Sequence, residues 1–253
     1  MSTPSTQGRA RDQELLGQTV VVIGGSSGIG LETARRARAE GANVVLAARD
    51  PERLRSAALD VGASRTAAFD ANDAAALERF FGDLPQPIDH VLVTAGRPVY
   101  GRLLDMDLEV ARRGLLEHPL QMIQVARSAA GKMGPGGSLL FMGGTGGRRA
   151  SVGIAPTATA MLPPLTASLA LELAPVRVNL IAAGFVDTAL SASLLGDDLE
   201  ARREQLRATL PIGRVVGPAD VAALAVHLMT NTALTGATYD VDGGQQFATA
   251  AWG

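Results

Sequence analysis

The feature of this sequence that most constrains its fold is a β-branched run that leads directly into a glycine-rich segment. Residues 19–23 are all Thr, Val or Ile, a composition typical of a strand buried on both faces of a sheet. Gly24-Gly25-Ser26-Ser27-Gly28-Ile29-Gly30 follows at once, and helical periodicity then runs from about Gly28 to Glu40. A strand, a glycine turn and a helix in this order predict the first unit of an α/β domain.

The three spaced glycines have different physical roles in such a turn. Gly24 allows the tight turn, Gly28 lets the backbone approach a phosphate, and Gly30 lets the helix pack closely against the strand. The amides at the start of the helix then face the ligand. A glycine loop without a ligand is the alternative, but the position after the first strand favours a site for the pyrophosphate of a dinucleotide. Its expected residues are Gly24, Ser26, Ser27, Gly28, Ile29 and Gly30.

Apolar runs and helical segments alternate from residue 18 to the C-terminus. The expected strands are residues 19–23, 43–47, 66–69, 90–94, 138–142, 176–181 and 238–241. The expected helices lie near residues 28–40, 51–61, 73–83, 106–133, 162–174, 197–208 and 218–230. This alternation predicts one doubly wound α/β Rossmann domain over residues 14–253. Its seven-stranded, mostly parallel sheet carries helices on both faces and binds the ligand at the carboxyl ends of the strands.

The N-terminus and the composition narrow the function classes. Residues 1–13 are small and polar, so we expect a flexible tail rather than a signal peptide or a membrane anchor. The apolar runs look too short to span a bilayer, and a net charge of −2 gives no general attraction to nucleic acid or anionic lipid. The chain has no cysteine, and its three histidines lack ligand spacing, so we expect no disulfide and no metal site. The simplest compartment is the cytoplasm.

Further motifs follow the glycine turn in a fixed order. They are Thr94-Ala95-Gly96, Arg177-Val178-Asn179, Gly184-Phe185-Val186-Asp187-Thr188, Thr235-Gly236 and Val241-Asp242-Gly243-Gly244. With these motifs the chain resembles the short-chain dehydrogenase/reductase family from about residue 17 to the C-terminus. The resemblance implies an oxidoreductase that uses a nicotinamide dinucleotide on a small carbonyl or alcohol substrate, and a homo-oligomer, either a dimer or a tetramer.

The end of the second expected strand bears on the choice of dinucleotide. An acidic residue there binds the ribose hydroxyls of NAD, whereas an arginine pairs with the 2′-phosphate of NADP. By the resemblance, the acidic position is Ala48, and Arg49 follows it. We interpret Asp50, before Pro51, as a helix cap. Arg49 therefore favours NADP(H), the alternative being an ordinary solvated arginine.

The resemblance also implies further cofactor contacts. Asp70 and Ala71 correspond to adenine contacts, and Ala95 and Gly96 to contacts with the adenosine ribose. Asp70 is equally well explained as a turn residue. The nicotinamide end corresponds to Gly184, Val186 and Thr188. The chain departs from the family where Val93-Thr94 replaces two asparagines and where Ala183 replaces a proline.

The expected catalytic residues are where the chain departs furthest from the family. Family members use a tyrosine four residues before a lysine, so that the ammonium group lowers the pKa of the phenol. Here the tyrosines are Tyr100 and Tyr239, and Lys132, the one lysine, is far from both. Alignment places Ala155 at the tyrosine position and Thr159 at the lysine position. The serine position falls near Gly144, with Thr145 next to it, and the asparagine position falls near His118.

Prolines and other polar residues complete this part of the analysis. Pro156, Pro163 and Pro164 predict a helix that is kinked or restarts near Leu162. Candidate proton donors or carbonyl ligands are His118, Tyr100 and Thr145, followed by Ser151, Thr157 and Thr159. Each also has a structural interpretation, and His90 and His227 look structural. Arg148 and Arg149 are either contacts for an anionic substrate or a solvated pair.

Two functions compete. The first is an NADP(H)-dependent oxidoreductase of this family with a non-standard proton donor, either His118 or water. The second is a catalytically silent NADP-binding regulator or assembly partner, which explains the missing tyrosine and lysine more directly. Isomerisation or dehydration on the same scaffold stays open, because a fold does not fix a function.

Overall fold

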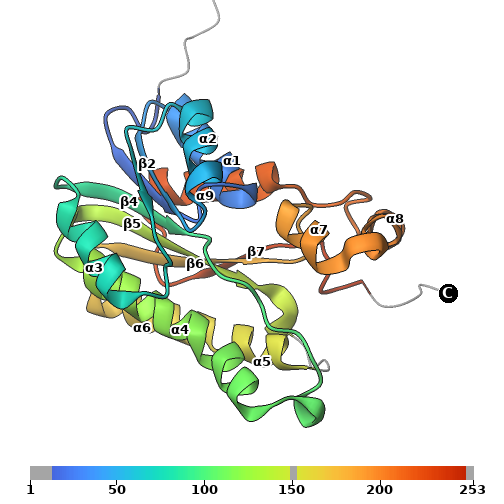
Figure 1. Ribbon diagram of the computed structural model, residues 1–253. Helices are drawn as coiled ribbons and strands as arrows, with labels where there is room; N and C mark the ends of the chain where they lie inside the picture. The colour runs from blue at the N-terminus through green and yellow to red at the C-terminus, as the bar shows by residue number, and fades with distance from the viewer. Residues whose placement is uncertain (1–12, 149–152, 249–253) are drawn as a thin grey trace, which may run out of the picture.

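A computed structural model describes residues 13–148 and 153–248 of the chain, so residues 1–12 of the expected tail lie outside the described part. Within it, seven parallel strands form one sheet in the order β3-β2-β1-β4-β5-β6-β7 (Figure 1). The strands are β1 Thr19–Ile23, β2 Asn43–Ala48, β3 Arg65–Ala68, β4 Ile88–Val93, β5 Met133–Gly144, β6 Arg177–Ala183 and β7 Thr238–Val241. The predicted Rossmann-type α/β fold is therefore confirmed.

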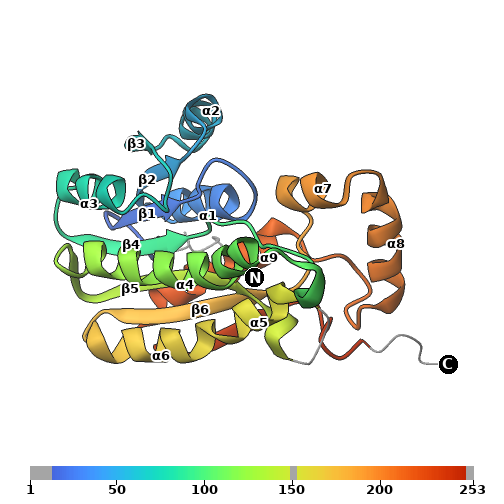
Figure 2. The same ribbon diagram turned by 60° about the horizontal axis from the view of Figure 1, so that its bottom comes forward.

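Helices cover both faces of the sheet, as Figures 1 and 2 show. One face carries α1 Gly28–Ala39, α2 Pro51–Val61 and α9 Pro218–Thr230. The other carries α3 Ala74–Asp83, α4 Leu108–Ala130, α5 Ile154–Ala160 and α6 Leu162–Glu172. The remaining helices, α7 Ala189–Leu195 and α8 Leu199–Thr209, project from one end of the sheet (Figure 1). The short turns η1 Leu103–Asp105, η2 Thr145–Arg148 and η3 Gly196–Asp198 complete the chain.

The two hydrophobic cores explain why the first strand is continuously apolar. Side chains alternate along a strand, so β1 sends Val21 and Ile23 into the core beneath α3, α4 and α6. Val20 and Val22 enter the core beneath α1, α2 and α9. All four are essentially inaccessible to solvent. A strand with two buried faces has no polar side, as the sequence indicated.

Two elements, β5 and α7, differ from the sequence-based expectations. β5 begins at Met133, not at Ser138, because Met133 pairs with Ile88 before an irregularity in the register. The sequence Gly134-Pro135-Gly136-Gly137 hides this extension, since it is typical of a turn. The helix expected to be interrupted by prolines is two helices, α5 and α6, and α6 begins at Leu162 as predicted. The short helix α7 was not expected.

The stretch Ile154–Glu172 is 19 residues long and apolar enough to cross a membrane by length and composition alone. This corrects the expectation that every apolar run is too short for a bilayer. In this fold the stretch is the pair α5 and α6, which buries Ile154, Leu162 and Leu169. An apolar helix that packs on a sheet meets the same criteria as a membrane span.

The motif Arg177-Val178-Asn179 has a structural role at the end of α9. The buried Arg177 guanidinium donates hydrogen bonds to the carbonyls of Leu228 and Met229 at 2.6 and 2.7 Å. Asn179 donates to the Leu234 carbonyl at 2.9 Å. A cation at a helix C-terminus satisfies free carbonyls and the helix dipole. These hydrogen bonds therefore hold β6 against the end of α9 and the segment that leads into β7.

His90 is a buried imidazole at the opposite end of β4 from the expected ligand. It is 4% exposed, and its Nε2 lies 2.6 Å from the Gln18 side-chain oxygen. Burial, together with the positive charge of Arg177, lowers the pKa of His90 to about 3. The imidazole is therefore neutral at physiological pH, and its burial and its contact with Gln18 are consistent with a structural role.

This low pKa predicts a specific acid sensitivity. An unfolded histidine binds a proton near pH 6.5, whereas folded His90 resists protonation until about pH 3. The stabilisation that depends on neutral His90 is therefore fully present above pH 6.5. As the pH is lowered from 6.5 to 3, the free energy of unfolding falls by up to about 1.4 kcal/mol per pH unit. We expect His90→Gln to show a shallower decline than the wild type in urea unfolding between pH 7.5 and 4.5. Parallel pH dependences would contradict the assignment.

Candidate functional site

The glycine turn connects β1 to α1 through contacts that exclude any side chain. Gly24 has φ +96°, and a Cβ on it would lie 2.4 Å from Thr94 Oγ1. A Cβ on Gly30 would lie 2.4 Å from the Gly24 carbonyl oxygen. Contacts this short do not occur between real atoms, so both positions require glycine. The roles predicted for Gly24 and Gly30, a tight turn and close packing of helix and strand, match this geometry.

Gly28 faces a different neighbour. Its φ is +55°, and a Cβ there would meet only the Thr188 side chain, at 3.4 Å. The N-cap Ser27 makes no side-chain cap bond, and the first turn of α1 has no acidic residue. The start of α1 thus presents amides without a side-chain cap toward the segment after β6. Free amides and the positive end of the helix dipole suit an anion.

Thr94 explains one departure from the family. Its hydroxyl donates to the Gly24 carbonyl at 3.2 Å, and its amide and that of Ala95 donate to the Ile23 carbonyl. The side chain therefore holds the end of β4 against the glycine turn. Ala95 and the exposed Gly96 follow at this edge, beside the turn as predicted.

Arg49 lies at the end of β2 with its side chain in solvent. Within the described residues it makes no hydrogen bond or ion pair, whereas neighbouring Asp50 accepts hydrogen bonds from the amides of Glu52 and Arg53 at 3.1 and 3.0 Å. Asp50 is thus the N-cap of α2, as predicted. The arginine stays available for an anion beside the glycine turn.

Asp70 and Ala71 follow β3 at the same edge of the sheet. The Asp70 carboxylate accepts the Asn72 amide at 2.9 Å, which is the geometry of an Asx turn. Ala71 is buried. The structural interpretation of Asp70 therefore holds, and its expected contact with adenine stays a prediction.

The segment after β6 is held from several sides. The Gly184 amide donates to the Val241 carbonyl at 3.1 Å, and Val186 pairs with Val216 in an isolated bridge. Thr188 caps α7 in a reciprocal capping box with Ser191. These contacts place Thr188 opposite Gly28, so the structure brings together two motifs that are far apart in the sequence.

Small residues form the wall of the site beyond the end of β5. A Cβ on Gly144 would lie 3.2 Å from the Thr159 methyl group, so Gly144 and Thr159 are immediate neighbours. The Thr159 hydroxyl donates to the carbonyls of Ala155 and Pro156 at 3.1 and 3.0 Å. Ala155 and Thr159 thus occupy successive turns of α5, as the alignment indicated, and the hydroxyl is bonded within its own helix.

His118 lies on the face of α4 that is turned toward the sheet. Gly114, one turn earlier, faces Ile154 and Val99, and Met122, one turn later, is fully buried. Burial lowers the pKa of His118, and an interaction with the Met142 carbonyl partly opposes this effect. A half-buried, neutral imidazole therefore lies at the carboxyl end of β5.

The other candidate donors have different surroundings. Tyr100 is 65% exposed in the loop after β4, and partial desolvation raises the pKa of its phenol, which makes it a poor acid. Thr145 is buried in η2. Arg148 pairs with Asp240 at 2.8 Å, while Arg149 and Ser151 lie outside the described residues. The exposed His227 lies on α9 and contacts Asn231, consistent with a structural role.

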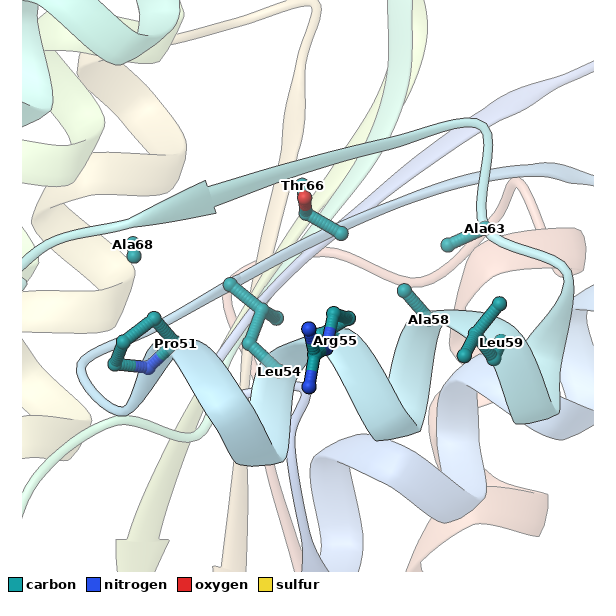
Figure 3. A pocket seen from close by; sticks show the side chains of 8 residues that line it. All are labelled: Pro51, Leu54, Arg55, Ala58, Leu59, Ala63, Thr66 and Ala68. Atoms are coloured by element: carbon teal, nitrogen blue, oxygen red, sulfur yellow. The ribbon is translucent and has the colours of Figure 1, made fainter.

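Pockets among the described residues include two of similar size. One, of about 250 Å³, is lined in part by Gly144, Arg148 and Thr159. The other, of about 260 Å³, lies between α2 and the edge strand β3, with Leu54 and Thr66 in its lining (Figure 3). Arg55 is the one charged residue of that lining, and the others are mostly apolar, so we assign no chemistry to this pocket. The described residues contain no group of three metal-ligating side chains placed to hold a metal ion.

The packing around Gly30 predicts that replacing glycine by alanine there and at Gly82 changes the stability in opposite directions. Gly30→Ala forces a carbon against the Gly24 carbonyl and should lower the free energy of unfolding by about 1–3 kcal/mol. Gly82 in α3 has nothing within 4 Å of its Cβ position. Gly82→Ala should raise the free energy of unfolding by about 0.5–1 kcal/mol. Urea unfolding of both variants measures this, and shifts in the same direction would refute the steric argument.

Comparison with known proteins agrees with the fold and with the order of the motifs. Residues 23–246 match the family described as enoyl-(acyl carrier protein) reductase. The short-chain dehydrogenase/reductase ATR9 of Stachybotrys chlorohalonatus is 30% identical over 250 residues, covering 90% of this chain and 96% of that protein. The human dehydrogenase/reductase SDR family member 4 is 30% identical over 258 residues, covering 95% and 91%.

Solved structures show the same similarity. A small-chain dehydrogenase in complex with NADPH has a TM-score of 0.78 and 26% identity, covering 91% of this chain and 99% of that one. A variant of the actinorhodin polyketide ketoreductase with NADPH has a TM-score of 0.82 and 27% identity, covering 90% and 97%. The chain belongs to the short-chain dehydrogenase/reductase family, a family of oxidoreductases.

Proposed function

We propose that this protein is an NADP(H)-dependent oxidoreductase that acts on a small carbonyl or alcohol substrate with a non-standard proton-transfer group. The observation that carries the proposal is the position of the glycine turn, with its free helix amides, opposite Thr188 and next to the unpaired Arg49. Relatives that share 26–27% of the sequence are solved with NADPH. A bound nicotinamide would supply or accept the hydride.

The residues at this edge fit a dinucleotide. Gly28 carries no side chain where a phosphate would approach the turn, and the first amides of α1 face that point. Val186 and Thr188, at the other side, would contact the nicotinamide end, and the bridge to Val216 and the capping box of α7 hold them in place. Gly24 and Gly30 keep the turn compact. These contacts would hold the cofactor without a contribution from Gly144, Ala155 or Thr159, the small residues beyond the end of β5.

Arg49 supports NADP(H) over NAD(H). Its guanidinium is exposed and forms no ion pair within the described chain, and Asp50 is committed to the α2 cap. An arginine is suited to a phosphate, and a charged hydrogen bond contributes about 1.5–3 kcal/mol. The side chain would then distinguish the two dinucleotides through the 2′-phosphate alone.

The choice of cofactor can be tested directly. Arg49→Ala should weaken NADPH binding by about 1–3 kcal/mol and leave NADH binding nearly unchanged. Arg55→Ala, which removes another exposed arginine six residues later, is the matched control and should bind both dinucleotides like the wild type. Isothermal titration of the three proteins gives the comparison. Equal weakening of NADPH and NADH by Arg49→Ala would remove the argument.

The residues beyond the end of β5 determine which groups are available for proton transfer. Ala155 and Thr159 stand where the resemblance places the tyrosine and lysine, and neither supplies an acid. His118 lies on α4 near the Met142 carbonyl of β5, and burial lowers the pKa of its imidazole, which is therefore neutral at pH 7. A neutral imidazole accepts a proton well but donates one poorly at pH 7. We therefore assign His118 the role of base in alcohol oxidation, and its protonated form returns the proton in the reverse reaction, carbonyl reduction, with water as the alternative group in both directions.

A panel of alcohols with NADP⁺, and of ketones, aldehydes and quinones with NADPH, tests this assignment. Alcohol oxidation should slow as the pH falls through the lowered pKa of His118, below 6.5. His118→Ala should reduce kcat by about 10²–10⁴ and remove this pH dependence. His227→Ala is the control, because His227 is exposed on α9. An unchanged kcat in His118→Ala would place the proton transfer elsewhere.

The rival function is a silent NADP-binding protein, a regulator or an assembly partner. It is favoured by the small and internally bonded residues of α5. Tight NADPH binding without turnover of any substrate in the panel would establish this alternative over the enzyme. Turnover above the uncatalysed rate would exclude it.

We also propose that the protein is a cytoplasmic homo-oligomer. Leu116 and Leu120 on α4 and Leu171 on α6 are 41%, 50% and 82% exposed. These side chains lie on helices of the same layer (Figure 2). A second subunit packed against α4 and α6 would cover these exposed apolar side chains.

A further inference from the structure

The turn between β3 and α3, residues 70–73, has little apolar anchoring. Ala71 is its buried residue, while Asp70, Asn72 and Asp73 are exposed. Asp70 accepts the amide of Asn72 on its carboxylate and the amide of Asp73 on its carbonyl, both at 2.9 Å. These hydrogen bonds set the shape of the turn. With one small side chain buried, the turn depends on polar contacts for its placement against the rest of the fold.

The side chain of Asn72 makes such contacts with α4. Its Nδ2 donates to Glu117 Oε1 at 2.5 Å, and its Oδ1 accepts from Gln121 Nε2 at 3.0 Å. Glu117 and Gln121 are four residues apart, so they lie on one face of α4, on successive turns. The helices α3 and α4 lie side by side on the same face of the sheet (Figure 2). One amide group therefore ties the turn to two points of a neighbouring helix.

These two hydrogen bonds are costly to lose. Gln121 is 4% exposed, and a buried donor that loses its partner costs about 1–3 kcal/mol. The acceptor on Glu117 is a carboxylate oxygen, and hydrogen bonds to charged groups are stronger than those between neutral groups. Because the donor and the acceptor of the Asn72 amide bind different residues, the pair fixes the orientation of this side chain as well as its position.

Asp70 gives the turn a group that can recognise a base. β3 pairs with β2, and Ala68, at the end of β3, lies opposite Ala48, which precedes Arg49. The turn and Arg49 therefore lie at the same edge of the sheet, where we propose the adenosine end of the dinucleotide. Within the described residues, Asp70 Oδ2 accepts no hydrogen bond. A carboxylate oxygen can accept from the amino group of adenine, a donor that hypoxanthine lacks.

We propose that Asn72, through Glu117 and Gln121, positions this turn so that the dinucleotide site selects adenine over a base without the amino group. Asn72 is a positioning residue, because its side chain contacts α4 and not the cofactor. The inference rests on the proposed function, since it needs a dinucleotide whose 2′-phosphate lies at Arg49. A turn released from α4 would keep its own hydrogen bonds, but the Asp70 carboxylate would no longer be held beside the base.

Isothermal titration with NADPH and with deamino-NADPH, in which hypoxanthine replaces adenine, tests the inference. The wild type should bind NADPH about tenfold or more tightly than deamino-NADPH, the effect of one hydrogen bond to a charged group. Asn72→Ala keeps the backbone amide that donates to Asp70, yet it should bind the two dinucleotides with nearly equal affinity. The ratio of the two affinities is the readout, because a loss of stability alone lowers both affinities equally.

Exchange of the donor and the acceptor provides a rescue. Asn72→Asp places two carboxylates side by side and should lose the selectivity for adenine. Glu117→Gln, added to Asn72→Asp, supplies a donor to the exchanged acceptor, and the double variant should recover most of the selectivity. Glu117→Ala, which keeps the bond between Asn72 and Gln121, should lose part of it and serves if Asn72→Ala does not fold.

Gln86→Ala is the matched control. Gln86 precedes β4, at the opposite edge of the sheet, and its side-chain amide donates to the Gly131 carbonyl at the end of α4 at 2.9 Å. This variant should keep the wild-type ratio. Equal affinity of the wild type for the two dinucleotides, or full selectivity in both Asn72→Ala and Glu117→Ala, would overturn the inference and leave the proposed function intact. Absence of NADPH binding to the wild type would overturn both.

Discussion

The carbonyl of Gly24 and the α-carbon of Gly30 lie so close that a single added carbon at residue 30 would be 2.4 Å from that oxygen. This approach sets where α1 begins relative to β1, and therefore where the amides of α1 point. Thr94 closes the arrangement by donating to the same carbonyl from the end of β4. The strands β1 and β4 are neighbours in the sheet, so the turn lies where the strand order reverses. Ligands bind at this point in open α/β sheets.

The sequence predicted the parts of this arrangement that depend on local chemistry. The run Thr19–Ile23 is typical of a strand buried on both faces, and Asp50 before Pro51 is typical of a helix N-cap; the structure has both. The restart of the helix at Leu162 follows in the same way from the positions of the prolines. Local rules decided these elements, and tertiary packing did not override them.

The rest depends on contacts that no local pattern contains. The extension of β5 to Met133 runs through glycines and a proline, and it exists because Met133 pairs with Ile88. The placement of Thr188 opposite Gly28 joins positions that only the sheet order brings together. The ion pair between Arg148 and Asp240 likewise was not foreseen from the sequence. Family resemblance aligned the motifs, but it did not say which side chains each motif would contact.

The site combines a glycine turn suited to a dinucleotide with small residues, Gly144, Ala155 and Thr159, where catalytic groups are expected. Gly144 leaves no room for a side chain beside Thr159, and the Thr159 hydroxyl is bonded to its own helix, so these residues offer shape rather than acidity. The neutral His118 lies on the neighbouring helix, at the end of β5. Such a site can orient a cofactor and a substrate while it leaves proton transfer to a group outside α5. Orientation alone accounts for a large part of enzymatic rate enhancement.

The most direct test of this account is a crystal structure of the protein with NADPH bound. We predict the pyrophosphate at the amides of Ser27–Ile29, the 2′-phosphate at Arg49, and the nicotinamide beside Val186 and Thr188, with His118 as the nearest titratable side chain to the space above it. A dinucleotide bound away from Gly24–Gly30, or an NADPH-soaked crystal with this turn empty, would contradict the account.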